Sequence, residues 1–348
     1  MTTAPKTMRG RSAGFSLLEA ILSSTLLAFM ALTVSGLAGS GRDTSAYAGM
    51  MNQITEVAQD ELAAVRRDTT ASVRLFTNDS TGLSYLARLD RRAFAGLTAA
   101  RLPGLDSLGT FRRDSGGSVR TGNILFFVRH DRTHDWTHPE MTTVRYRIDV
   151  YRFVAYYLRR VRATALSSPD NGLDLCRWVS VPFADATQIE DIADVDQRKL
   201  VIESLASGEN QAAPTRGFPG VRYLWRFGAD LSLARTFQRI QSDFSLADLT
   251  GGGLSTFMLP PDLGNIRVLR LWRRGFSVAT NAARANMGVS RFAVSSQTND
   301  GFPHGFEVQV IGPAAARQVL VHLSLVSTQM RGPKSYVESS VVADCRDL

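Results

Sequence analysis

The apolar and polar positions divide the chain into three stretches. In the first, Glu19 is the only ionisable side chain between Phe15 and Gly41, and 19 consecutive residues from Ala20 to Ala38 have no formal charge. A helix needs about 20 apolar residues to cross the hydrocarbon core of a bilayer. We therefore predict a membrane-spanning helix over residues 15–41.

The second stretch, residues 42–68, is amphipathic. Its apolar residues recur at steps of three and four positions, with glutamine and acidic residues between them. This period matches one face of an α-helix. We predict that the helix continues to about Arg67 and lays this face on the following domain. The face comprises Tyr47, Met51, Ile54, Ala58, Leu62 and Val65.

The third stretch, residues 69–348, consists mostly of short segments rich in β-branched and aromatic residues. A long helix followed by antiparallel strands predicts an α+β fold with a β-rich head. Because 280 residues make a large head, we also expect two lobes dividing near 207–217. We predict strands at 123–128, 142–150, 155–163, 221–227, 265–272, 306–311 and 318–326, helices at 188–206 and 231–241, and loops at 167–172 and 250–253.

Basic residues before the apolar stretch set its orientation. Lys6, Arg9 and Arg11 precede the stretch, and a basic flank of this kind stays on the cytoplasmic side. The head is therefore predicted to be exported. The chain has a net charge of +8, which would fall to +5 without residues 1–14, so charge alone is a weak argument for a nucleic-acid partner.

Two general interpretations account for part of this pattern. A cleaved secretory signal would use a small-residue site such as "VSGLAGS" at 34–40. An uncut signal anchor would explain the length and the basic flank. Neither explains why the apolar stretch begins abruptly after Gly14. Nor does either explain a carboxylate at Glu19, because an unpaired charge is costly there.

A third interpretation rests on "GFSLLEA" at residues 14–20. This motif closely resembles the cleavage and methylation site of type IV prepilins and of type II secretion pseudopilins. The resemblance implies that prepilin peptidase cuts after Gly14 and methylates Phe15, so that residues 1–14 are a leader, or 8–14 if translation starts at Met8. It also implies partners: other pilin-like subunits, an inner-membrane assembly platform and membrane lipid. The resemblance covers residues 9–68 and says little about the head.

In such a subunit, Glu19 gains a partner only after cleavage. The new amine at Phe15 is four residues earlier, or one helical turn away. A carboxylate meeting this amine, on its own chain or on a neighbour, cancels two charges that are each expensive in an apolar layer. We therefore predict that Glu19 sets the register of assembly.

The two cysteines match neither a CxxC pattern nor a metal-ligand spacing. In an oxidising compartment, a Cys176–Cys345 disulfide would tie the C-terminus to the middle of the head and stabilise it by about 2–5 kcal/mol. The alternative is two buried free thiols. The sequence leaves both open.

The segment "RHDRTHDWTHPE" at 129–140 is the best candidate for a metal site. His130, His134 and His138 recur every four residues, and on a helix this spacing would place three imidazoles on one face for zinc or another transition metal. Pro139 and the preceding strand favour a solvated polar connection instead. We therefore predict no metal.

Two basic clusters lie close to aromatic residues, and such mixtures bind DNA through phosphate contacts and stacking. Arginines on an exposed strand face give the same pattern, so nucleic-acid contact is kept only as an alternative. The clusters are Arg159, Arg160 and Arg162 beside Tyr156 and Tyr157, and Arg267, Arg270, Arg273 and Arg274 beside Trp272.

The sequence contains no phosphate-binding glycine loop, no G-x-S-x-G and no H-E-x-x-H motif, so neither an enzyme nor a cofactor is predicted. The resemblance implies a minor pilin or pseudopilin of the inner membrane, with a cytoplasmic N-terminus and a periplasmic head. It would assemble into a type IV pilus or a type II secretion pseudopilus, and the large head favours a tip or priming position. The alternative is a binding module on the same helix, either an adhesin or a DNA-uptake receptor.

Overall fold

The computed structural model describes most of the helix and much of the head. The described residues are 17–88, 100–106, 109–114, 120–160, 172–180, 182–207, 220–221, 223–225, 238–239, 264–268, 275–281, 283–284, 292–293, 302–327 and 336–347. The chain forms two compact units, residues 1–52 and residues 53–348.

One long helix, α1 (Leu17–Thr70), begins the described chain. Residues 17–49 are exposed on all sides, whereas one face is buried from residue 54 onward. This confirms the predicted continuous helix, but Tyr47 is exposed rather than packed. The buried positions follow helical steps of three and four: Ile54, Val57, Ala58, Leu62, Val65, Asp68 and Thr69.

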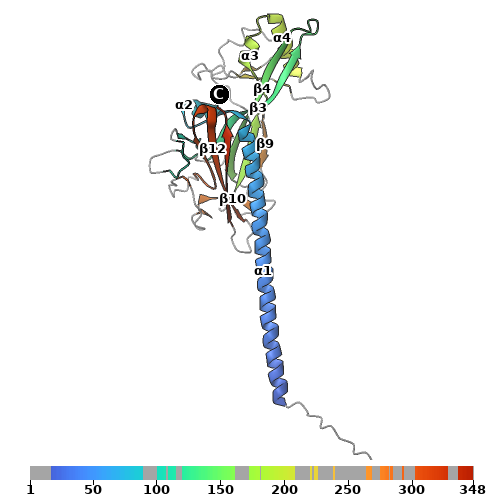
Figure 1. The fold of residues 1–348 in the computed structure, drawn as a ribbon, viewed down its shortest axis with the longest axis vertical. Helices are drawn as coiled ribbons and strands as arrows, with labels where there is room; N and C mark the ends of the chain where they lie inside the picture. The colour runs from blue at the N-terminus through green and yellow to red at the C-terminus, as the bar shows by residue number, and fades with distance from the viewer. Residues whose placement is uncertain are drawn as a thin grey trace, which may run out of the picture. The chain divides into compact units, whose positions relative to one another are not determined.

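The thirteen strands among the described residues of the head belong to one sheet. Several of them are labelled in Figure 1. The strands are β1 (Ser72–Leu75), β2 (Leu105–Asp106), β3 (Leu125–Thr137), β4 (Arg145–Arg160), β5 (Gly172–Ser180), β6 (Phe183–Asp185), β7 (Tyr223–Trp225), β8 (Gln238–Arg239), β9 (Gly264–Val268), β10 (Phe276–Ala279), β11 (Phe306–Ile311), β12 (Arg317–Ser327) and β13 (Tyr336–Cys345). The described helices of the head are α2 (Ser80–Arg88), α3 (Ala186–Glu190), α4 (Val195–Ser207) and a 3-10 turn, η5 (Ala314–Ala316).

Sheet order explains how distant segments meet. The main path runs β2-β11-β12-β10-β5-β4-β6-β7-β8, while β1, β3, β9 and β13 pair with members of this path or with one another. Most neighbours are antiparallel, and the β2–β11 and β6–β7 pairs are parallel. This confirms an α+β fold with a β-rich head.

The two faces of the sheet are covered differently. Side chains alternate between faces along a strand, so Tyr156 and its neighbour Tyr157 point to opposite sides. The end of α1 lies on the Tyr156 side, where Asp68 accepts a hydrogen bond from the Tyr156 hydroxyl. On the other side, Phe76 stacks on Phe126 with ring centroids 4.5 Å apart. Tyr157 belongs to this second aromatic cluster, which also includes Tyr85 from α2.

A separate hydrophobic cluster lies at the turn end of the β3–β4 hairpin. Trp136 and Ile148 pack there with Ile189 of α3 and with Val201 and Leu205 of α4. Asp185 caps α3, because its side chain accepts a hydrogen bond from the backbone amide of residue 187 at 2.9 Å. β3 and β4 contribute to both clusters, so the two clusters share one sheet.

Several element predictions for this part of the head are wrong. Residues 129–137 belong to β3 rather than to a polar connection, and the predicted strands 142–150 and 155–163 are the single strand β4. The β3–β4 ladder continues through His134↔Ile148 and Trp136↔Tyr146, so polar residues alternate with buried ones along the strands. The predicted helix 188–206 is two helices, and residues 238–239 of the predicted helix 231–241 form β8.

The remaining predictions have mixed outcomes. The strands predicted at 306–311 and 318–326 are confirmed as β11 and β12. Only Ser207 of the proposed lobe boundary at 207–217 belongs to the described residues. The predicted loops fall outside them, except for residue 172, which starts β5.

Candidate functional site: an exposed apolar helix and its anchor on the sheet

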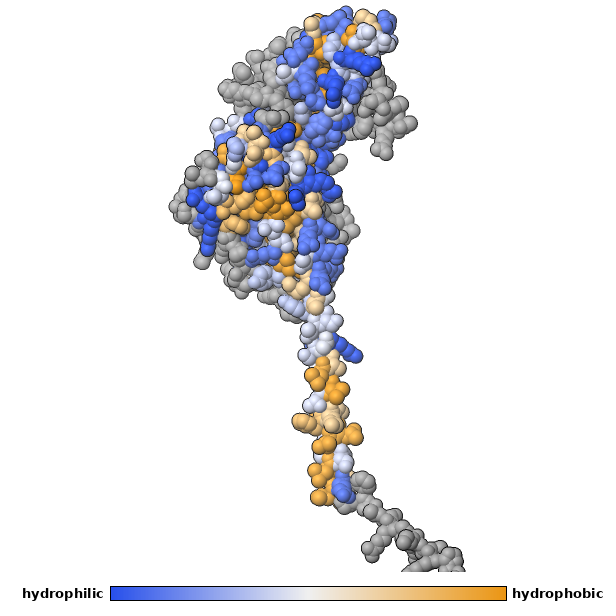
Figure 2. Space-filling view, in the orientation of Figure 1, coloured by the Kyte–Doolittle hydropathy of each residue, from blue (hydrophilic) through white to orange (hydrophobic). Residues whose placement is uncertain are grey.

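The first half of α1 is apolar on every side. Leu17, Leu27 and Leu37 are 81%, 70% and 72% exposed, and other large apolar side chains lie between them on all helix faces. Figure 2 shows hydrophobic side chains in orange along this part of the helix. Among the described residues, α1 is the one helix long and apolar enough to cross a membrane. A helix that is apolar all round requires lipid or other protein around it.

Ser24, Thr25 and Thr33 in this apolar half donate their hydroxyl hydrogens within the helix. Ser24 donates to the carbonyl of Ile21 at 2.9 Å. The Thr25 hydroxyl donates to the carbonyls of Ile21 and Leu22. The Thr33 hydroxyl donates to the carbonyls of Phe29 and Met30. Such bonds to carbonyls three or four residues earlier remove the cost of placing a hydroxyl in an apolar layer. This half of the helix therefore fits an apolar environment despite its polar residues.

Glu19 lies in the first turn of α1 and is exposed. The first turn of a helix has free amide groups and the positive end of the helix dipole, so a carboxylate is favourable there. The predicted processing residues, Gly14 and Phe15, lie outside the described residues. Their predicted roles stay predictions.

The other end of α1 is fastened to the sheet by one carboxylate, Asp68, which is only 6% exposed. Its Oδ1 accepts from Nη1 of Arg129 on β3 at 2.8 Å. Its Oδ2 accepts from the hydroxyl of Tyr156 on β4 at 2.7 Å and from Nε of Arg177 on β5 at 2.6 Å. One residue of the helix therefore joins three adjacent strands.

The contacts keep Asp68 charged. Burial alone would raise its pKa, but the hydrogen bonds from Arg177 and Tyr156 and the charges of Arg177 and Arg129 outweigh that effect and hold the pKa of Asp68 below its ordinary value. Burial and the nearby Asp68 charge raise the pKa of Tyr156. The tyrosine therefore stays protonated and remains a donor to Asp68.

Ion pairs continue outward from this anchor along the β3–β4 hairpin. Asp131 lies 4.0 Å from Nη2 of Arg129, 2.8 Å from Nε of Arg152 and 3.0 Å from Nη1 of Arg132. These groups are partly buried, so their interactions are screened less than those of a fully exposed pair. The anchor is therefore part of a larger charged network.

Sequence reasoning missed Asp68. The only signal is positional: Asp68 follows Val65 by three residues and so continues the buried face of α1. A carboxylate on a buried face needs a buried partner. The partners come from β3, β4 and β5, more than 60 positions later, which no local pattern reveals.

In the structure Cys176 and Cys345 are buried free thiols, the second of the two alternatives that the sequence leaves open. Cys176 lies on β5 and Cys345 on β13, and β10 and β12 stand between these strands in the sheet. Neighbouring strands are about 4.8 Å apart, so the separation exceeds the roughly 7 Å between Cα atoms that a disulfide allows. Burial raises the pKa of each thiol to about 11.

The three histidines of 129–140 do not converge. His130 lies 3.4 Å from Asp149, His134 is buried with Nε2 3.0 Å from the Ser204 hydroxyl, and His138 accepts from backbone amides in the hairpin turn. A register shift between His130 and Arg132 breaks the regular alternation along β3. Among the described residues, no three His, Cys, Asp or Glu side chains form a group able to hold a metal.

The two tyrosines of the first candidate nucleic-acid cluster are buried. Tyr156 and Tyr157 are both 0% exposed, so neither ring can stack on a base. Arg159 is half-buried on β4, opposite Asp174. Arg267 lies on β9, opposite Arg177. Arg160 ends β4, while Arg162, Arg270, Trp272, Arg273 and Arg274 lie outside the described residues.

No protein-family model, no curated protein and no solved structure matches the chain. The functional assignment therefore rests on the motif at residues 14–20, the exposed apolar half of α1 and the Asp68 anchor.

Proposed function

We propose that this protein is a minor pilin-like or pseudopilin-like subunit. It is made with a leader, inserted in the inner membrane with its N-terminus cytoplasmic and its head periplasmic, cut after Gly14 and methylated at Phe15 by prepilin peptidase. It then packs through α1 with other pilin-like subunits into a type IV pilus or a type II secretion pseudopilus. The large head supports a tip or priming position, because a bulky head crowds regular helical packing.

The observation that supports this proposal is the division of α1 into two halves. The first half exposes apolar side chains all round, and the second half is buried along one face and fixed by Asp68. A free amphipathic helix would need no such anchor. An assembly helix needs both features. Lipid or neighbouring helices must surround its apolar half, and the head must stay firmly attached to the other half when the helix packs into the assembly.

Glu19 supports the same proposal at the level of chemistry. It is the one ionisable residue in the apolar stretch from Phe15 to Gly41, and a charge in an apolar layer is costly unless an opposite charge lies near it. Cleavage after Gly14 would create an amine of opposite charge one turn away.

The test begins with processing. The full chain is expressed with and without an active prepilin peptidase, and the intact mass is measured. We expect the loss of residues 1–14 and the gain of one methyl group at Phe15 only when the peptidase is active. A Gly14→Val variant is the matched control and should stay uncut. An unchanged mass of the wild-type chain in the presence of the peptidase would overturn the proposal.

The second step tests assembly. Glu19→Leu is expected to be cut normally but to stay in the membrane fraction, whereas a matched change in the head at the exposed Glu203, to Leu, should assemble at the wild-type level. Entry of the Glu19→Leu chain into isolated filaments at the wild-type level would remove the register role of Glu19. Processing and assembly are measured separately, so each part of the proposal can fail alone.

A DNA-binding or adhesive function is not proposed. The aromatic rings that would stack on bases, Tyr156 and Tyr157, are buried. Most of the associated arginines lie outside the described residues. No observation on the described surface favours DNA or an adhesion partner as a ligand.

A further inference from the structure

Four arginines, hereafter the arginine cluster, lie on the three strands that hold the end of α1: Arg129, Arg132, Arg152 and Arg177. Arg129 on β3 and Arg152 on β4 are direct partners in the antiparallel ladder. Side chains of such partners point to the same face of a sheet, and like charges placed opposite one another are destabilising. This part of the fold therefore needs negative charge close by.

One source of negative charge is Asp131 on β3, which three of the arginines share. Its carboxylate lies 2.8 Å from Nε of Arg152, 3.0 Å from Nη1 of Arg132 and 4.0 Å from Nη2 of Arg129. One carboxylate carries a single negative charge and can neutralise only one guanidinium group. Further negative charge is needed to offset the other two.

The second source is Asp68 at the end of α1, which is also shared. Its carboxylate lies 2.8 Å from Nη1 of Arg129 and 2.6 Å from Nε of Arg177. Among the described residues, the four guanidinium groups of the arginine cluster therefore lie within 4.0 Å of two carboxylates. Positive charge is in excess at this place by two charges.

Two further observations show that the excess is unfavourable. Burial lowers the pKa of the Arg132 guanidinium, and the charge of Arg152 lowers it as well, against the opposing effect of Asp131. Nε of Arg129 is buried and has no hydrogen-bond partner among the described residues. A buried donor without a partner costs free energy. An anion that accepts hydrogen bonds from these groups would offset both effects.

The arginine cluster is partly buried but not sealed. The side chains of Arg129, Arg152 and Arg177 are 27%, 18% and 20% exposed. Water and small ions can therefore reach the guanidinium groups, and partial burial reduces the screening of their charge. The small exposed area does not suit a nucleic acid, which contacts basic residues along an extended groove.

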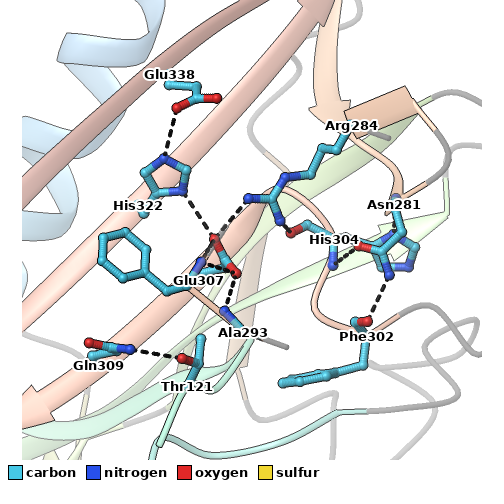
Figure 3. A network of polar contacts seen from close by, with 11 residues as sticks. Thr121, Asn281, Arg284, Ala293, Phe302, His304, Glu307, Gln309, His322 and Glu338 are labelled. Carbon is cyan, nitrogen blue, oxygen red and sulfur yellow. Dashed lines mark hydrogen bonds and ion pairs between the residues drawn. The ribbon is translucent and has the colours of Figure 1, made fainter. Parts of the chain in front are cut away.

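A second charged network of the head has a different balance of charge (Figure 3). There Arg284 donates to Glu307 at 2.9 Å, and His322 lies 3.2 Å from Glu307 and 3.7 Å from Glu338. Arg284 and Glu307 are 0% and 1% exposed. Carboxylates outnumber guanidinium groups in that network, and its central pair is closed to solutes. Excess positive charge within reach of solvent therefore distinguishes the arginine cluster.

We infer that the arginine cluster binds a small oxyanion of the phosphate or sulfate type beside Arg129 and Arg152. A guanidinium group presents paired N–H donors that match the oxygens of such an ion, and these charge-assisted bonds are stronger than bonds between neutral groups. A doubly charged ion also matches the excess of two positive charges. The inference is independent of the proposed function, since it concerns the head of a single subunit.

The test is isothermal titration calorimetry of the full chain in detergent micelles at pH 7, with inorganic phosphate and, separately, with sulfate. The buffer contains no other oxyanion, and sodium chloride keeps the ionic strength constant because added salt screens charges. We expect saturable binding of one ion per chain. Arg152→Gln should weaken the affinity about tenfold or more, because it removes a charge and a charge-assisted donor. Arg147→Gln, at a 76% exposed site on the same strand, is the matched control and should leave the affinity unchanged.

Three results would overturn the inference. The first is the absence of saturable binding to the wild-type chain, and the second is unchanged affinity in Arg152→Gln. The third is an equal loss of affinity in Arg147→Gln, which would indicate a general attraction of anions to a basic protein. If Arg152→Gln does not fold, Arg152→Lys takes its place. It keeps the charge but lacks the planar fork, so weaker binding supports the site and unchanged binding rejects it.

A lipid headgroup carries the same phosphate chemistry, and a further titration separates the two sources. Phosphatidylglycerol is added to the micelles in place of the inorganic ion. Binding of inorganic phosphate or sulfate without any need for this lipid supports a site for a free ion. Binding of the lipid together with no binding of either inorganic ion would reject it.

Discussion

At the scale of single residues, Asp68 makes the clearest prediction. Replacing Asp68 with Asn removes the charge that pairs with Arg129 and Arg177. The partly buried Arg177 then loses this ion pair, and Arg129 keeps only Asp131 at 4.0 Å. We expect a loss of about 2–4 kcal/mol of stability at pH 7. The measurement is thermal unfolding of the full chain in detergent, with tryptophan fluorescence as the signal.

The stabilisation by the Asp68 charge should depend on pH in a defined direction. The pKa of Asp68 is lowered in the folded protein, so its stabilisation is complete above the ordinary aspartate pKa of about 3.9 and disappears as the pH falls. The difference between wild type and Asp68→Asn should therefore shrink below pH 4. Asp60→Asn, on the exposed face of α1, is the control. It should change neither the stability at pH 7 nor the dependence of stability on pH. A difference that is constant with pH would show that the Asp68 charge is not what fastens the helix.

The two cysteines give a second prediction at this scale. With a pKa of about 11, each thiol is about one-thousandth thiolate at pH 8, and both are buried. A thiol reagent should therefore label neither cysteine in the folded protein and both after denaturation without a reductant. Labelling that requires a reductant would mean that Cys176 and Cys345 are disulfide-bonded.

Residue roles were predictable only where they depend on nearby sequence. The Glu19 argument needs only residues 14–20, and the buried face of α1 follows from residues 54–65. Asp68 and Glu307 act through partners that sheet pairing brings together, such as Tyr156 for Asp68 and His322 for Glu307. Residues 129–140 were predicted to be a polar connection because of their many polar residues and Pro139, whereas residues 129–137 continue β3 with a register shift.

At the scale of elements, β11 and β12 show what alternation can and cannot predict. Both strands were located correctly, because Phe306, Val308 and Val310 alternate with polar residues. The same alternation indicates a solvated second face, yet Glu307 and Gln309 are buried. Whether a polar strand face meets water depends on segments elsewhere in the chain. That information is absent from the strand itself.

The glycines of α1 provide a prediction about this element. An added Cβ at Gly39 would meet nothing within 4 Å, and alanine is favoured over glycine in a helix by about 1 kcal/mol. Gly39→Ala should therefore slow hydrogen exchange of the surrounding amides about fivefold in micelles. Gly82 is the contrast, because a Cβ there would lie 1.9 Å from the Thr77 carbonyl oxygen, and Gly82→Ala should destabilise α2. Faster exchange in Gly39→Ala would contradict a regular, uncrowded helix at this position.

At the scale of the whole molecule, the boundary between the two compact units separates two roles of one helix. Residues 1–52 contain the exposed apolar half of α1, while residues 53–70 belong to the head and contribute Ile54, Leu62 and Asp68 to its buried interior. The head therefore includes the second half of the helix as part of its fold. A truncation that respects this division should behave differently from one that removes the whole helix.

We expect a chain lacking residues 1–52 to be soluble and folded, because it keeps the buried face of α1 and the Asp68 anchor. A chain lacking residues 1–70 should aggregate, because it exposes the apolar sheet face around Tyr156 and leaves Arg129 and Arg177 without Asp68. Size-exclusion chromatography and near-UV circular dichroism compare the two chains. In the chain lacking residues 1–52, Leu62→Asp should disrupt the packing of the helix on the head at one buried site. Ala63→Asp, on the exposed face of the helix, is its control. A folded, soluble chain without residues 1–70 would show that the head does not need the helix, and it would reduce Asp68 from an anchor of the fold to a local contact.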